Sequence, residues 1–63
     1  MTHPGHLGVI EDLERVLSAM PLNQVAMKRS KERYLKIEID RARRAGYSAQ
    51  AILDAQRRGR GLK

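Results

Sequence analysis

Between residues 23 and 46 the spacing of the apolar side chains changes, and this change limits the folds open to the chain. Val25 and Met27 alternate with polar or small residues, as in a short strand with one buried face. After Ser30 the apolar residues recur at spacings of three and four, which is typical of a helix. One continuous helix is the competing interpretation, because alanine, methionine, lysine and arginine all favour that state. The first interpretation predicts a strand at residues 23–29, and the second predicts none.

Three helices are expected: one before this stretch, one within it and one after it. Residues 7–20 carry an apolar stripe, and Pro21 either ends that helix or begins the next element. Ser30 is the expected N-cap of a helix over residues 31–45, and Gly46 fits the position just past its end. Ser48 then caps a last helix over residues 49–58. The residues expected to be buried in these last two helices, and to form a dimer core, are Leu35, Ile39, Ile52 and Leu53.

The chain has 63 residues and no cysteine, so it can form one small domain without disulfides. We expect a flexible N-terminus at residues 1–6, a domain at residues 7–58 and a flexible basic tail at residues 59–63. Small chains without covalent staples are usually stabilised by oligomerisation, so a homodimer is expected. His3 and His6 alone are too few to hold a metal ion, and neither a metal nor another cofactor is expected.

Charge is distributed unevenly along the chain. Residues 1–23 carry three acids against one arginine, a charge of −2, whereas residues 24–63 carry twelve lysines or arginines against four acids, a charge of +8. The whole chain has a formal net charge of +6. A concentration of positive charge of this kind attracts phosphate polymers. Nucleic acid is therefore the first expected partner, ahead of an anionic membrane surface or an acidic protein.

No arrangement of residues points to catalysis. The serines have no histidine at a telling distance, and no glycine-rich loop joins a strand to a helix. The chain is therefore not expected to be an enzyme. No run of about twenty apolar residues and no export signal is visible, so we expect a cytoplasmic protein without a membrane partner.

A strand, a helix, a Gly-x-Ser turn and a second helix in a basic chain resemble the ribbon-helix-helix repressors of the Arc and MetJ type. The residues that carry the resemblance are Gln24 to Lys28, Ser30 to Ala45 and Gly46 to Ser48, with Ile52 and Leu53 following. The resemblance implies a mostly α fold: a ribbon-helix-helix dimer with a short intermolecular β-ribbon and an extra N-terminal helix. It also implies a dimeric transcriptional repressor that binds double-stranded DNA sequence-specifically, with the ribbon in the major groove.

In that family the outward side chains of the ribbon read base edges. The resemblance implies that Gln24 and Lys28 face bases, with Ala26 against a thymine methyl group, while Val25 and Met27 lie in the dimer core. The residues implied to contact the DNA backbone are Arg29 and Lys31, together with Ser48, Ala49 and Gln50. The last three lie at the start of the helix at residues 49–58, which corresponds to the second helix of the family.

A second hypothesis keeps the helices and removes the ribbon. It predicts an all-α helical hairpin or three-helix protein that binds a protein partner or dimerises without reading DNA. The helix at residues 7–20 exceeds the minimal ribbon-helix-helix fold, and it is a possible contact for such a protein partner. Strand or helix at residues 23–29 distinguishes the two hypotheses.

Overall fold

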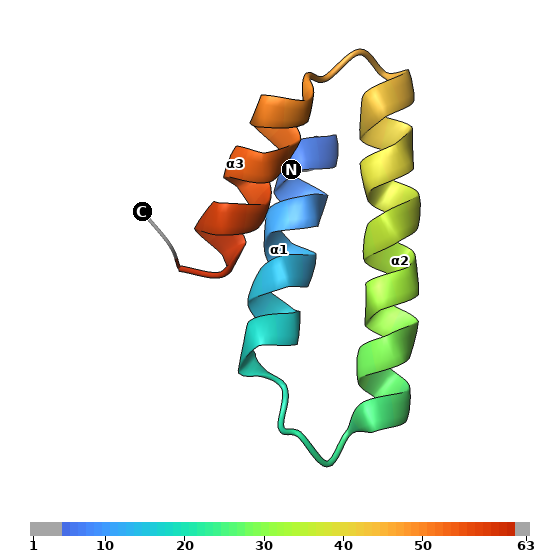
Figure 1. The fold of residues 1–63 in the computed structure, drawn as a ribbon, viewed down its shortest axis with the longest axis vertical. Helices are drawn as coiled ribbons and strands as arrows, with labels where there is room; N and C mark the ends of the chain where they lie inside the picture. The colour runs from blue at the N-terminus through green and yellow to red at the C-terminus, as the bar shows by residue number, and fades with distance from the viewer. Residues whose placement is uncertain (1–4, 62–63) are drawn as a thin grey trace.

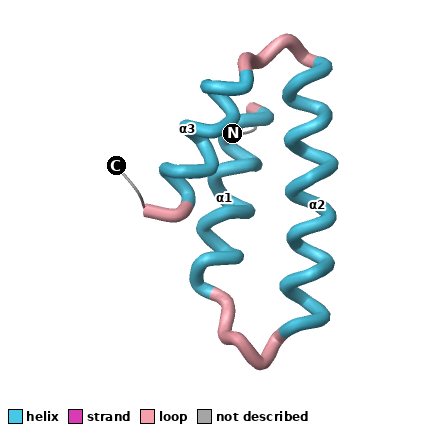
Figure 2. The backbone as a smooth tube through the Cα atoms, viewed as in Figure 1, coloured by secondary structure: helices cyan, strands magenta, loops and turns pink. Residues whose placement is uncertain are grey.

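The computed structural model describes residues 5–61, which form three helices joined by two short loops (Figure 1). Helix α1 spans His6–Ala19, α2 spans Val25–Arg44 and α3 spans Ala49–Gly59. Residues 5–61 contain no strand (Figure 2). The expectation of a mostly helical fold is confirmed, in the form of the three-helix alternative.

The strand predicted at residues 23–29 is wrong. Helix α2 begins at Val25, and the backbone N–H of Lys28 donates to the carbonyl of Gln24 at 3.0 Å, closing the first turn. Val25 and Met27, the expected dimer core, are 54% and 55% exposed. Extending an existing helix adds one hydrogen bond per residue and needs no partner strand, so the strong helix formers in this segment prevail. Without a strand there is no ribbon, and the assignment to the ribbon-helix-helix family is wrong as well.

The two predicted helix caps differ in outcome. Ser30 lies inside α2 and is exposed, so its predicted role as an N-cap is wrong. Ser48 does cap α3, because its hydroxyl oxygen accepts from the backbone N–H of Ala51 at 3.1 Å. That bond satisfies one of the donors that a helix start leaves without an intrahelical partner.

The end of α2 follows the prediction for Gly46. This glycine has φ +101°, a left-handed conformation that other residues seldom adopt. The N–H of Gly46 donates to the carbonyl of Arg43, and the N–H of Tyr47 donates to the carbonyl of Ala42, both at 3.1 Å. The two bonds close α2 and turn the chain toward α3.

One core forms within the single chain. Its buried members come from all three helices: Ile10, Leu13, Leu35, Ala42, Ile52 and Ala55, with Leu7, Val9, Leu17 and Ile39 packed against them. Leu35, Ile39 and Ile52 are thus core residues, as expected, but of an intrachain core. Leu53 is 44% exposed in the single chain, so it lies outside this core, and its place in a dimer core stays a prediction. The buried face of α3 instead follows Ile52, Ala55 and Gly59, at helical spacing.

Helix α1 contacts both other helices, whereas α2 and α3 barely touch (Figure 1). Gly59 lets α3 approach α1 closely. A side-chain carbon at this position would lie 2.6 Å from the Cβ of Glu14 and would also collide with the backbone carbonyl of Glu11. Because such contacts are sterically forbidden, a glycine is required where α3 crosses α1.

The predicted ends of the domain shift slightly. His6 already belongs to α1, and Gly59 belongs to α3 rather than to a tail. Residues 1–4 and 62–63 lie outside the described residues, and so does most of the predicted flexible N-terminus. Among the helices described, none combines the length and the apolar character needed to cross a membrane.

Candidate nucleic-acid interface

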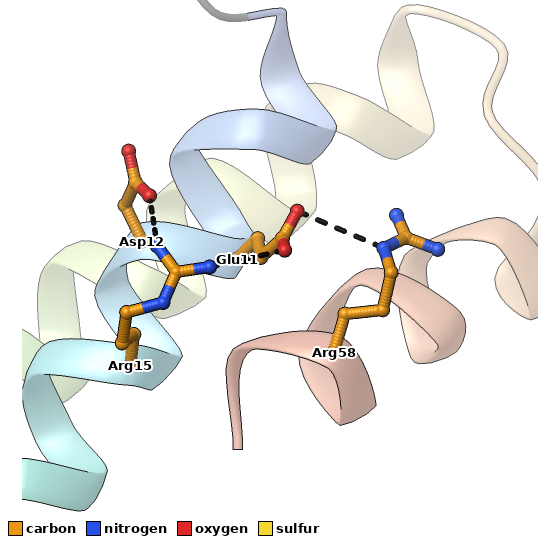
Figure 3. A network of polar contacts seen from close by, with 4 residues as sticks. All are labelled: Glu11, Asp12, Arg15 and Arg58. Atoms are coloured by element: carbon orange, nitrogen blue, oxygen red, sulfur yellow. Dashed lines mark hydrogen bonds and ion pairs between the residues drawn. The ribbon is translucent and has the colours of Figure 1, made fainter. Parts of the chain in front are cut away.

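The acidic side chains of α1 are paired with arginines of the same chain. Arg15 lies between two of them, with Nη1 at 2.8 Å from Asp12 Oδ1 and Nη2 at 3.1 Å from Glu11 Oε1 (Figure 3). Arg58 of α3 approaches the other oxygen of Glu11, with Nε at 3.7 Å from Oε2 (Figure 3). The negative charge of α1 is therefore largely balanced where α1 meets the C-terminal end of α3.

Glu14 is the most buried acid of α1, with 4% of its surface exposed. Its carboxylate accepts from Gln56 Nε2 at 3.0 Å and from Arg60 Nε at 2.8 Å. A buried carboxylate needs such donors, because burial without them would carry a large desolvation cost. The hydrogen bond to Glu14 and its negative charge raise the pKa of the Arg60 guanidinium. This acid, too, is neutralised within the α1–α3 contact.

Helix α2 carries most of the positive charge. Its twenty residues include eight lysines or arginines and three acids, which leaves a charge of +5. Two of the acids are paired within the helix: Glu38 with Arg41 at 3.2 Å and Asp40 with Arg44 at 3.2 Å. Glu38 is 5% exposed, and the Nδ1 atom of His6 lies 4.0 Å from its second oxygen. The cations of α2 thus outnumber the acids that could neutralise them.

Four basic side chains lie along the outer side of α2: Arg29, Arg33, Lys36 and Arg43, which we call the basic face. All four are exposed, and none forms an ion pair with any residue of the described chain, 5–61. At about 100° per residue they fall within an arc of about 80°, directed away from the buried face of Leu35 and Ala42. They span about 21 Å of helix axis.

The residues predicted to read bases do not form one surface. Gln24 precedes α2 and its side chain makes no capping hydrogen bond. Ala26 and Lys28 are two positions apart on a helix, so they point about 200° apart. The outward set Gln24, Ala26 and Lys28 is wrong, because it required the alternation of a strand.

The predicted backbone contacts are divided by the structure. Arg29 lies on the basic face, whereas Lys31 is partly buried and, two positions on, points about 200° away from it. Ser48 caps α3, and Ala49 and Gln50 begin it. All three are exposed, and the Gln50 amide donates to Asp54 Oδ1 at 2.9 Å. A phosphate at the start of α3 stays a prediction.

Sequence reasoning missed the buried acids and the arginines that hold them. The signal was present for Glu14, which lies four residues after Ile10 and one after Leu13, inside the apolar stripe of α1. It also missed that Tyr34 and Ile37 remain half exposed, at 49% and 50%. No sequence pattern says which side of a helical hairpin a third helix will cover.

Histidine is the remaining residue type that could bind a metal ion. The ring of His6 packs edge-on against that of Tyr47, with centroids 6.0 Å apart. His3 lies outside the described residues. Within the described part of the chain, no three or more histidine, cysteine, aspartate or glutamate side chains gather as a metal site would require.

The sequence matches no protein-family model, and comparisons with curated proteins and with solved structures give no match. Function is therefore argued from the geometry of α2 and its surroundings.

Proposed function

We propose that this protein binds double-stranded DNA through the phosphate backbone, using the basic face of α2. The observation that carries the proposal is the set of four exposed cations, Arg29, Arg33, Lys36 and Arg43, on one side of one helix. The acids of α1 do not offset this charge locally, because they are paired with Arg15, Arg58 and Arg60. Positive charge without internal partners is what a phosphate polymer recognises.

The dimensions of the basic face suit a duplex. Double-stranded DNA carries about one negative charge per 1.7 Å of its axis, so about 21 Å of helix meets several phosphates. The major groove is about 12 Å wide and accepts an α-helix. Because the four side chains of the basic face are exposed, this side of α2 is open to such a partner. Phosphate contacts position a protein without carrying sequence information, so the proposed binding is largely independent of sequence.

A duplex is favoured over a single strand. Binding of single strands depends on aromatic side chains that stack on bases. The chain has two tyrosines and no phenylalanine or tryptophan, and neither tyrosine belongs to the basic face. Homodimerisation and repression by occlusion are not required by this proposal and stay separate predictions.

The test is the salt dependence of binding to a 20-base-pair duplex. The logarithm of the association constant falls with the logarithm of salt concentration by about 0.9 for each phosphate neutralised. The double variant Arg33→Gln, Lys36→Gln should therefore lower the steepness of this dependence by about 1.8. The control is Arg57→Gln, which removes an exposed cation of α3 that forms no ion pair within residues 5–61. An equal loss of steepness for each charge removed by the control and by the double variant, or binding that does not respond to salt, would contradict the proposal.

A further inference from the structure

A shallow groove runs between α1 and α2 on the side away from α3. It is lined by Leu13 of α1 and by Ser30, Lys31, Arg33, Tyr34 and Ile37 of α2, with no residue of α3. Helix α3 lies on the other side of the hairpin, where Gln56 and Arg60 reach Glu14. The α1–α2 groove is therefore an open face of the helical hairpin, and it shares Leu13 with the core and Arg33 with the basic face.

The floor of the groove is apolar and accessible. Tyr34 is 49% exposed and Ile37 is 50% exposed. Val16 is 43% exposed, and it follows Leu13 by three residues, on the same face of α1. Met27 is 55% exposed and precedes Tyr34 by seven residues, so it lies two turns away along the same face of α2. Apolar residues at such spacings are the anchors that an amphipathic helix uses in a groove.

The edge of the groove is positively charged. Lys31 and Arg33 line it, and neither forms an ion pair with another residue between 5 and 61. The half-exposed apolar side chains offer on the order of 300 Å², whereas a stable interface takes about 800 Å² from each partner. The rest of any interface must come from the basic surroundings.

This charge decides between possible occupants. A second copy of the chain, with its own net charge of +6, would bring Lys31 and Arg33 close to the same residues of its neighbour if the two grooves paired symmetrically. Like charges placed together in an interface oppose binding. An acidic helix would instead pair with both cations while its apolar stripe covers Tyr34 and Ile37. We propose that the α1–α2 groove binds an acidic amphipathic helix of a partner protein, completing a four-helix arrangement.

Two designed helical peptides of 21 residues provide the test. Both carry the same leucine and isoleucine stripe, and the positions beside the stripe are glutamate in one and lysine in the other. The glutamate peptide should bind with one peptide per chain, measured by fluorescence anisotropy, and the lysine peptide should not. Amide chemical-shift changes should cluster at Leu13, Val16, Tyr34 and Ile37. Ile37→Ser should weaken binding by about tenfold or more.

Leu53→Ser is the matched control, because Leu53 is exposed to a similar degree, 44%, but lies on α3. It should leave the affinity for the glutamate peptide unchanged. Equal binding of both peptides, or shift changes away from the groove, would overturn the proposal. So would a dimer in sedimentation equilibrium that Ile37→Ser dissociates, since a second copy would then fill the groove. The same shift pattern with a DNA duplex would assign the groove to nucleic acid. The peptide measurements contain no DNA, so they test the groove separately from the DNA binding proposed for the basic face, although Arg33 belongs to both surfaces.

Discussion

Glu14 and Arg60 meet at 2.8 Å between Oε2 and Nε, although 46 positions separate them in the chain. Glu14 also accepts from Gln56, so one buried carboxylate of α1 binds both a residue of α3 and the residue that follows α3. The arrangement is asymmetric, because Glu14 is buried whereas the Arg60 side chain is 48% exposed. Removing the acid therefore frees Arg60 into solvent and does not strand a buried charge.

Glu14→Ala should lower the free energy of unfolding by about 1–3 kcal/mol, the usual cost of losing hydrogen bonds to a buried charged group. Asp12→Ala is the control, because Asp12 is 63% exposed and its pair with Arg15 should contribute less than about 1 kcal/mol. Urea unfolding of the two variants measures both values. Equal losses would show that the burial of Glu14 does not matter.

The raised pKa of Arg60 has a definite consequence for pH dependence. A cation whose pKa is higher in the folded state contributes stability that is fully present below its unfolded pKa. That contribution is lost only as pH rises through the folded value, which is strongly alkaline for arginine. We therefore expect the Arg60→Gln variant and the unmodified protein to differ in stability by the same amount at pH 8 and pH 10. Urea titrations at these two pH values test the expectation, and a difference that shrinks at pH 10 would contradict it.

Gly59→Ala should destabilise the protein by about 1–3 kcal/mol, because the added methyl group overlaps the backbone of Glu11 and the side chain of Glu14. In an exposed helix the same substitution would stabilise by about 1 kcal/mol. Whether Gly59→Ala lowers or raises the melting temperature therefore tests the close approach of α3 to α1. Arg57→Ala, at an exposed position of α3, should change stability by less than about 0.5 kcal/mol.

Serine at positions 48 and 30 gives a matched pair. Ser48→Ala should cost about 1 kcal/mol, because it removes the acceptor for the N–H of Ala51. Ser30→Ala should be neutral or slightly stabilising, since Ser30 is exposed inside α2 and alanine favours helix. Chemical denaturation of both variants distinguishes the true cap from the interior serine. A larger loss of stability from Ser30→Ala than from Ser48→Ala would indicate that the helix begins at Lys31.

Proline tests the start of α2 directly. Proline is tolerated in the first position of a helix but costs about 3 kcal/mol or more in its interior. Val25 is the first residue of α2 and Lys31 is its seventh. Val25→Pro should therefore cost about 1 kcal/mol at most, and Lys31→Pro about 3 kcal/mol or more, measured by thermal unfolding. The opposite order would mean that residues 25–30 are not helical.

The ends of α1 and α2 and the start of α3 were predictable from local signals. Pro21 and Gly46 mark where helices end, and Ser48 marks where α3 begins, because each acts through its own backbone geometry or hydrogen bond. The helical start of α2 at Val25 was not predictable in this way. Alternation of Val25 and Met27 fits a strand only if a partner covers one face, and here both side chains are exposed on a helix.

The candidate interface was predictable in its charge but not in its shape. The excess of lysine and arginine after residue 24 is visible in the sequence, and helical spacing then places Arg29, Arg33 and Lys36 on one side of α2. The α1–α2 groove depends on which side α3 covers. That choice follows from the contacts of Gly59 and Glu14 with distant residues, so local periodicity carries no information about it.

The position of α1 between two helices that barely meet has a consequence for how perturbations combine. Substitutions at the α1–α3 contact, such as Gly59→Ala, and substitutions on the outer side of α2 share no neighbours. Effects of well-separated sites usually add, whereas effects of touching sites do not. Substitutions at these two places should therefore have additive effects on stability, although the three helices share one core. The residues of α2 proposed to bind DNA can therefore be substituted without disturbing the ion pairs that hold Arg58 and Arg60 against α1.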